Sequence, residues 1–144
     1  MNLSKKTAVM FQDTKIDAKF KLSALWVVLM FCYTYADILG FYTPGNLEEL
    51  LAGEIAGIQM TQGLLLGSAV LMAIPSAMVF LSLALKARAN RWVNIIAGLV
   101  YMGVLASTFV TGRNPAYYIF YAIGKAVLIA VIVWHAFRWP KTDA

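Results

Sequence analysis

Hydrophobic residues gather in four long runs along the chain, and short polar segments separate them. The runs cover residues 22–42, 60–85, 92–111 and 115–137. As a helix, each run is long enough to cross a hydrocarbon core about 30 Å thick. None alternates between apolar and polar residues as the strands of a membrane β-barrel do. Because backbone groups in lipid must be hydrogen-bonded within their own segment, we predict four transmembrane helices.

The second run is longer than one crossing requires. It has no charged residue between Met60 and Leu85, and it contains Pro75. Proline removes one backbone hydrogen bond from a helix, and a long span fits a membrane by tilting or kinking. We therefore expect this helix to tilt, or to kink at Pro75.

The segment between the first two runs is predicted to hold an additional amphipathic helix over residues 46–58. Thr43-Pro44-Gly45 is typical of a turn, and Asn46 followed by Glu49 has the spacing of a capping box. Apolar side chains then recur at helical spacing and share one face: Leu47, Leu50, Leu51, Ile55 and Ile58. We expect this helix on the outer surface or over the mouth of the bundle, with Glu54 within its apolar face.

Together these elements predict an all-α fold, an integral membrane four-helix bundle with one additional amphipathic helix. The transmembrane domain covers residues 22–137. A basic segment, residues 1–21, precedes it, and a short tail, residues 138–144, follows it. We expect no cleavable signal peptide, because polar residues follow Lys5 and Lys6 where a short apolar core would be required.

Composition supports a membrane protein and argues against several other classes. Hydrophobic residues make up 61% of the chain and charged residues 13%, whereas a soluble domain has about half and about a quarter. The net charge of +5 comes without a dense basic stripe with interleaved aromatic residues, so nucleic acid is not an expected partner. Cys32 is the one cysteine and His135 the one histidine, so we expect no disulfide, metal site or haem.

Lysine and arginine predict the orientation of the spans. Ten of them flank one side of the predicted bundle, whereas Arg113 alone lies in the loops of the other side. Because basic residues concentrate on the cytoplasmic side, we predict an inner-membrane protein with both termini cytoplasmic. Four tryptophans lie near the predicted cytoplasmic boundary, where they are expected to form an interfacial belt: Trp26, Trp92, Trp134 and Trp139.

Ionisable residues inside the spans are the main functional candidates, because a charge in the membrane is costly and usually faces the bundle interior. Asp37 lies near the outer end of the first span and Lys125 near the middle of the fourth. Helical spacing places Tyr33 on the stripe of Asp37, and it places Tyr118 and Tyr121 on the stripe of Lys125. The candidate ligand or ion-pair residues are Tyr33, Asp37, Glu54, Arg113, Tyr121 and Lys125.

These residues allow three interpretations. They could form a polar pocket for a ligand or a proton in the outer half of the bundle. They could form a salt bridge that sets the register of two helices. Alternatively, Lys125 could extend its flexible side chain to the outer interface. We assign no catalytic residue, because the sequence contains no phosphate-binding loop, catalytic triad or paired carboxylates.

Small residues at four-residue spacing predict where the helices approach one another closely. The pairs are Gly63 with Gly67, Gly103 with Ser107, and the series Ala122, Ala126 and Ala130. This spacing is also compatible with a homo-oligomer.

Four short runs of residues carry a resemblance to an uncharacterised family of small bacterial four-helix membrane proteins. They are Tyr35 to Tyr42, the Ala-Gly-Glu-Ile-Ala-Gly run at residues 52–57, Met72 to Ser76, and Asn90 to Asn94. In size and helix count the chain is also similar to the DoxX-like proteins, although no residue motif matches them. Some DoxX-type proteins are membrane subunits associated with quinone-linked oxidation, so this resemblance implies an accessory redox role.

We therefore expect a non-enzymatic membrane protein that binds a small ligand, lipid or partner in the outer half of its bundle. Its cofactor requirement is open at this level. Two alternatives come from other classes: a proton-coupled small-molecule transporter, and an accessory subunit of a quinone-linked oxidoreductase. Substrate-induced proton movement would favour the first, and co-purified quinone would favour the second.

Overall fold

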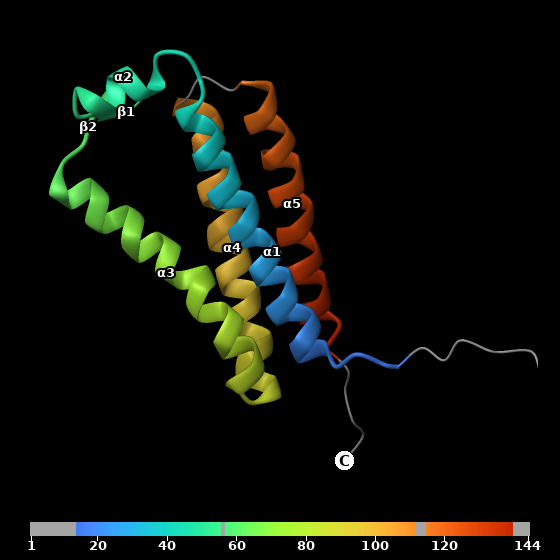
Figure 1. The fold of residues 1–144 in the computed structure, drawn as a ribbon. Coiled ribbons are helices and arrows are strands. Elements are labelled where there is room, and N and C mark those ends of the chain that lie inside the picture. Colours follow the sequence, from blue (N-terminus) through green and yellow to red (C-terminus); the bar gives the residue numbers. More distant parts are fainter. Residues whose placement is uncertain (1–13, 56, 112–114, 140–144) are drawn as a thin grey trace, which may run out of the picture.

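The computed structural model of the protein describes residues 14–55, 57–111 and 115–139. Four long helices, α1, α3, α4 and α5, form a bundle, and a short helix and a hairpin connect the first two (Figure 1). The elements in chain order are α1 (Ala18–Phe41), α2 (Asn46–Leu51), β1 (Glu54–Ile55), β2 (Ile58–Gln59), α3 (Gln62–Ala84), α4 (Ala87–Thr111) and α5 (Ala116–Phe137). Each long helix is long and apolar enough to cross a membrane. The prediction of an all-α, multi-pass membrane fold is confirmed.

Polar side chains set where two of the long helices begin. The carboxylate of Asp17 accepts a 2.9 Å hydrogen bond from the backbone N–H of Lys19, so α1 begins before its apolar run. The hydroxyl of Thr61 accepts a 3.2 Å hydrogen bond from the backbone N–H of Leu64 at the start of α3. Both are N-caps, which satisfy backbone donors that the first turn of a helix leaves without partners.

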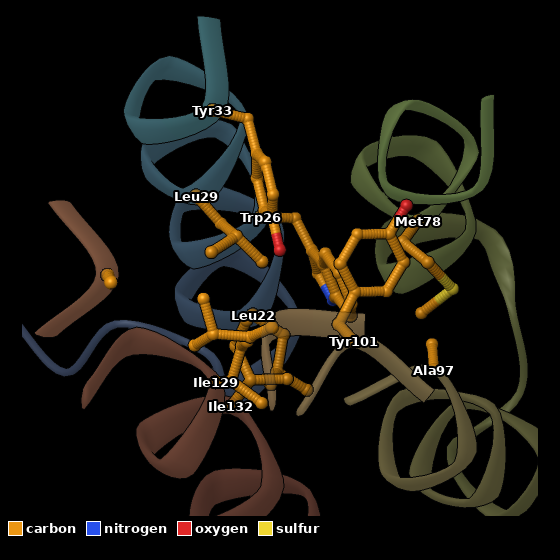
Figure 2. Packing of buried hydrophobic residues seen from close by; sticks show 11 residues of the cluster. Leu22, Trp26, Leu29, Tyr33, Met78, Ala97, Tyr101, Ile129 and Ile132 are labelled. Carbon is orange, nitrogen blue, oxygen red and sulfur yellow. The ribbon is translucent and has the colours of Figure 1, made fainter. Parts of the chain in front are cut away.

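Helix α1 packs between α3 and α5, and α4 packs mainly against α5. Trp26 of α1 lies at the centre of the core, fully buried, with its ring 5.9 Å from that of Tyr101 in an edge-to-face arrangement (Figure 2). Trp26 is therefore a core residue, and its prediction as a belt residue is wrong. Trp92 and Trp134 are each 55% exposed, as belt residues would be.

A buried polar network joins three helices beneath this core. The ring N–H of Trp26 donates a 2.7 Å hydrogen bond to the side-chain oxygen of Asn94, which also accepts from the hydroxyl of Ser82 at 3.3 Å. The amide of Asn94 donates to Asn90, whose own amide donates to the Ser82 carbonyl. All four residues are fully buried. Mutual hydrogen bonding offsets the cost of burying these groups, and it links α1, α3 and α4.

Pro75 lies inside α3, and its effect is compensated from α4. Proline has no N–H, so the carbonyl of Leu71, one turn earlier, lacks its helical donor. The hydroxyl of Tyr101 donates a hydrogen bond to that carbonyl. A backbone group that would be costly to leave unsatisfied in a membrane is thereby paired.

The two halves of α3 differ in packing. After Pro75 the helix buries Met78 and Ser82 against the bundle, whereas residues 61–70 are all exposed. Figure 1 shows α3 leaning away from the other long helices toward its N-terminal end. The expectation that this long span tilts or kinks agrees with this geometry.

The closest approach of two helices at a glycine lies at Gly98 among the described residues. A Cβ atom there would lie 2.6 Å from a methyl carbon of Val133, so α4 and α5 pack closely at this position. The glycines that were predicted to mark close helix approach have no such neighbours. Gly67 and Gly103 have open space where a Cβ atom would lie. At Gly63 that atom would meet only the Thr61 side chain. Their spacing therefore does not mark helix contacts within one chain.

The segment after α1 differs from the single helix predicted over residues 46–58. Helix α2 ends at Leu51, and β1 and β2 then form an antiparallel hairpin that pairs Glu54 with Gln59. Gly53 and Gly57 have φ values of +81° and +78°, in the left-handed region that other residues rarely adopt. These glycines end the helix and form the turn, even though the apolar residues have helical spacing. Among the described residues α2 packs against α1 and β1.

Candidate functional site

Lys125 lies on the buried stripe of α5. The residues of this stripe recur at intervals of three and four: Ala122, Lys125, Ile129, Ile132 and Ala136. Its neighbours on the stripe are apolar core residues, and only 2% of the Lys125 side chain is exposed. An ammonium group therefore occupies a position where the helix pattern calls for an aliphatic side chain. This burial argues against the interpretation in which Lys125 extends to the outer interface.

Two tyrosine rings flank the ammonium group. The Nζ atom of Lys125 lies 4.3 Å from the ring centroid of Tyr33 and 5.0 Å from that of Tyr118. Tyr33 comes from α1, and Tyr118 lies two turns before Lys125 on α5. The negative face of an aromatic ring attracts a cation, most strongly where water is excluded. We call Tyr33, Tyr118 and Lys125 the lysine cage.

Asp37 lies one turn after Tyr33 on α1 and close to the lysine cage. Its charge and that of Lys125 attract each other, but the two side chains do not form an ion pair. The Asp37 side chain lies on the exposed surface of the bundle, whereas Lys125 lies inside. The structure thus brings together the two predicted intramembrane charges without the direct salt bridge that would lock helix register.

The lysine cage retains unused hydrogen-bonding capacity. The hydroxyl of Tyr33 is buried and has no hydrogen-bond partner among the described residues. Lys125 likewise forms no hydrogen bond or ion pair with any residue that the structure describes. A lysine ammonium has three donors, and a tyrosine hydroxyl has one. Buried polar groups are normally paired, so this arrangement has room for an acceptor that the described residues do not provide.

The other predicted site residues lie elsewhere or outside the described range. Glu54 lies on the hairpin and not on a helix, and it accepts a 2.5 Å hydrogen bond from Gln59 of the paired strand. Tyr121 packs edge-to-face against Phe120, with ring centroids 5.6 Å apart. Arg113 lies outside the described residues.

Tyr118 is a residue of the lysine cage that is absent from the predicted candidates. Helical spacing places it on the stripe of Lys125, seven residues away, but Tyr121 of the same stripe was the predicted site residue. Among the described residues no group of histidine, cysteine, aspartate and glutamate side chains could hold a metal ion.

The comparisons with known proteins identify a family but no activity. The model of a family of unknown function (DUF6326) matches residues 10–144, which is nearly the whole chain. This match confirms the expectation of an uncharacterised family. No curated protein and no solved structure is similar to the chain.

Proposed function

Because the chain belongs to this family of unknown function, DUF6326, we propose its function from the site alone. The protein binds a small, largely apolar molecule through a carbonyl oxygen that lies at the lysine cage. It does so in the half of the bundle that carries α2 and the hairpin. The protein is a multi-pass protein of a bacterial inner membrane, and its termini lie in the cytoplasm.

One observation carries this proposal: a buried lysine and a buried tyrosine hydroxyl share one site, and no described residue accepts a hydrogen bond from either. Lys125 is 2% exposed, and its Nζ atom lies over the ring of Tyr33, whose hydroxyl is buried without a partner among the described residues. A ligand oxygen that accepts from both would remove the cost of burying them. Aromatic rings on two sides would contact the apolar body of such a ligand.

The charge of the site favours a neutral acceptor over an anion. When ionised, Asp37 provides a negative charge near Lys125. A carboxylate ligand would therefore add a second negative charge in a medium that screens charge poorly. A carbonyl oxygen accepts the same hydrogen bonds without this repulsion. Quinones belong to this chemical class, in line with the accessory redox role that the DoxX-like resemblance implies.

The test compares a short-chain benzoquinone with its dimethoxybenzene analogue, in which weakly accepting methyl ether oxygens replace the two carbonyl oxygens. Binding to the full-length protein in detergent is measured as the rise in the thermal unfolding midpoint with ligand concentration. Tyr33→Phe removes only the buried hydroxyl, so it should weaken quinone binding about fivefold, the effect of one hydrogen bond. Tyr121→Phe is the matched control, because Tyr121 is not part of the lysine cage.

Three results bear on the proposal directly. Preference for the quinone over its analogue, together with weaker binding to Tyr33→Phe alone, supports it. Equal binding of both compounds, or equal effects of the two tyrosine variants, contradicts it. Lys125→Met should abolish the preference for the quinone, because it removes the ammonium donors.

The positions of Asp37 and Lys125 support a second candidate function, that of a proton-coupled carrier. One titratable group lies on the surface of α1, and the other lies inside the bundle within reach of its charge. A carrier of this kind would move protons across a vesicle membrane when substrate is added. Asp37→Asn should then abolish proton movement while binding persists, whereas the binding protein proposed above would move none.

A further inference from the structure

The end of the bundle opposite α2 is strongly basic. Helices α1 and α4 begin there, and α3 and α5 end there. The described basic residues at this end are Lys15, Lys19, Lys21, Lys86, Arg88, Arg91 and Arg138. Asp17 is the one described acidic residue near them, and its carboxylate already caps α1. This end therefore carries a positive potential that the described part of the chain does not neutralise.

A groove of about 360 Å³ lies at this basic end, away from the lysine cage. The first turns of α4 contribute Ala87, Arg88, Arg91 and Trp92 to its lining, and Trp139 comes from the segment that follows α5. Two arginines and two tryptophans thus line one concave surface. Tryptophan favours the headgroup level of a membrane, so we place this groove at the depth of the lipid headgroups.

Among the described residues, aromatic rings and no carboxylate hold Arg91 in place. Its guanidinium carbon lies 5.3 Å from the ring centroid of Phe137 and 5.9 Å from that of Trp92. Its Nε atom is buried and has no hydrogen-bond partner among the described residues. The planar guanidinium is therefore already oriented, and it retains donors that no described residue uses.

The start of α4 adds donors to the same groove. Ala87 and Arg88 belong to the first turn of this helix, where backbone N–H groups have no intrahelical acceptor. The positive end of the helix dipole also favours an anion there. Arginine forks and helix N-termini both recognise the tetrahedral oxygens of phosphate.

We infer that this groove binds a phosphate ester, carried by the headgroup of an anionic phospholipid. The arginines and the start of α4 would hold the phosphate, while Trp92 and Trp139 would contact the glycerol and the first chain carbons. A soluble phosphate ester has the same anionic chemistry, but it has no acyl chain for the tryptophans. This inference does not depend on the function proposed for the lysine cage.

The experiment measures binding of a short-chain phosphatidylglycerol to the full-length protein in an uncharged detergent, by native mass spectrometry. Phosphatidylcholine of the same chain length tests whether net negative charge is required, and glycerol phosphate tests the soluble source. The variant Arg88→Gln/Arg91→Gln removes two charges inside the groove. The control, Lys21→Gln/Arg138→Gln, removes two charges at the same end of the bundle but outside the groove lining.

We expect the groove variant to lose about tenfold in phosphatidylglycerol affinity, whereas the control loses less than about threefold. Arg91→Lys retains the charge but not the planar fork, so it should lie between the wild type and the groove variant even if the double variant is unstable. Equal losses in the two double variants would overturn the inference, because they indicate diffuse surface charge. Equal binding of phosphatidylcholine would also overturn it.

Glycerol phosphate distinguishes the two sources of the phosphate. Failure to compete at concentrations where phosphatidylglycerol saturates supports the lipid as occupant. Full competition at equal concentration overturns the lipid assignment, because it shows that the acyl chains and the tryptophans contribute nothing to binding.

Discussion

Lys125 shows how a single residue can depart from the pattern of its helix and still be accommodated. The residues before and after Lys125 on this stripe, Ala122 and Ile129, are both buried. The helix therefore places the ammonium group inside the core. The rings of Tyr33 and Tyr118 and the nearby charge of Asp37 offset part of the cost of removing the ammonium from water. The sequence identified the residue as a candidate, because a lysine in the middle of an apolar span is rare.

Single and double variants of Lys125 and Asp37 test their interaction. Asp37→Asn leaves the buried ammonium without its nearby negative charge, so it should lower the free energy of unfolding by about 1 kcal/mol or more. Lys125→Met in addition removes that ammonium, so the double variant should be more stable than Asp37→Asn alone. Thermal unfolding in detergent measures all three. Additive effects of the two substitutions would show that the charges are independent.

At the scale of elements, α3 depends on a hydroxyl from a neighbouring helix. Pro75 leaves the Leu71 carbonyl without a backbone donor, and Tyr101 of α4 supplies the missing hydrogen bond. The sequence showed that Pro75 would interrupt the helix. It could not show which residue compensates, because Tyr101 lies 30 positions from Leu71 and depends on the packing of α3 against α4.

This compensation predicts a non-additive pair of substitutions. Tyr101→Phe should lower the free energy of unfolding by about 1 kcal/mol, because it leaves a carbonyl unsatisfied. Pro75→Ala restores the backbone N–H, so Tyr101→Phe should cost less in that background. A double-mutant cycle in detergent measures the difference. The same loss in both backgrounds would mean that the hydroxyl does not replace the missing backbone donor.

The short connecting elements show where helical periodicity misleads. Leucine and isoleucine at helical spacing predicted one helix over residues 46–58, but Gly53 and Gly57 adopt left-handed backbone conformations. Two such residues cannot belong to a regular α-helix. The hydrophobic pattern persists on this segment as exposed side chains, among them Leu51 at 82%. Glycine at both positions is evidence against one continuous helix, and it outweighs the helical spacing of the apolar residues.

The whole molecule has a strong charge asymmetry between its two ends. The basic end carries every described lysine and arginine except Lys125, whereas the other end carries Glu48, Glu49 and Glu54. Positive charge is retained on the cytoplasmic side during insertion, so we expect the basic end and both termini in the cytoplasm.

Cysteine labelling of intact cells tests this orientation. In a Cys32→Ala background, Glu49→Cys should react with a membrane-impermeant maleimide from outside, and Arg88→Cys should react only after the cells are opened. Glu49 belongs to α2 and Arg88 to the first turn of α4, at opposite ends of the bundle. The reverse labelling pattern would overturn the orientation.

Hydropathy along the chain determined the number of spans, their approximate limits and the membrane class of this protein. These properties depend on local composition and length, because each span must satisfy its own backbone in lipid. The sequence also located the intramembrane charges, Asp37 and Lys125. Helical spacing alone placed Tyr33 on the same stripe as Asp37, and Tyr121 on the same stripe as Lys125.

Tertiary structure decided which faces of these helices meet. Packing placed Trp26 in the core instead of at the interface and brought Tyr33 of α1 to Lys125 of α5. It also made Gly98, and not Gly103, the point of close helix approach. Rotation and tilt of a span arise from many small packing contacts with its neighbours, because lipid is as apolar as the helices and provides no directional preference.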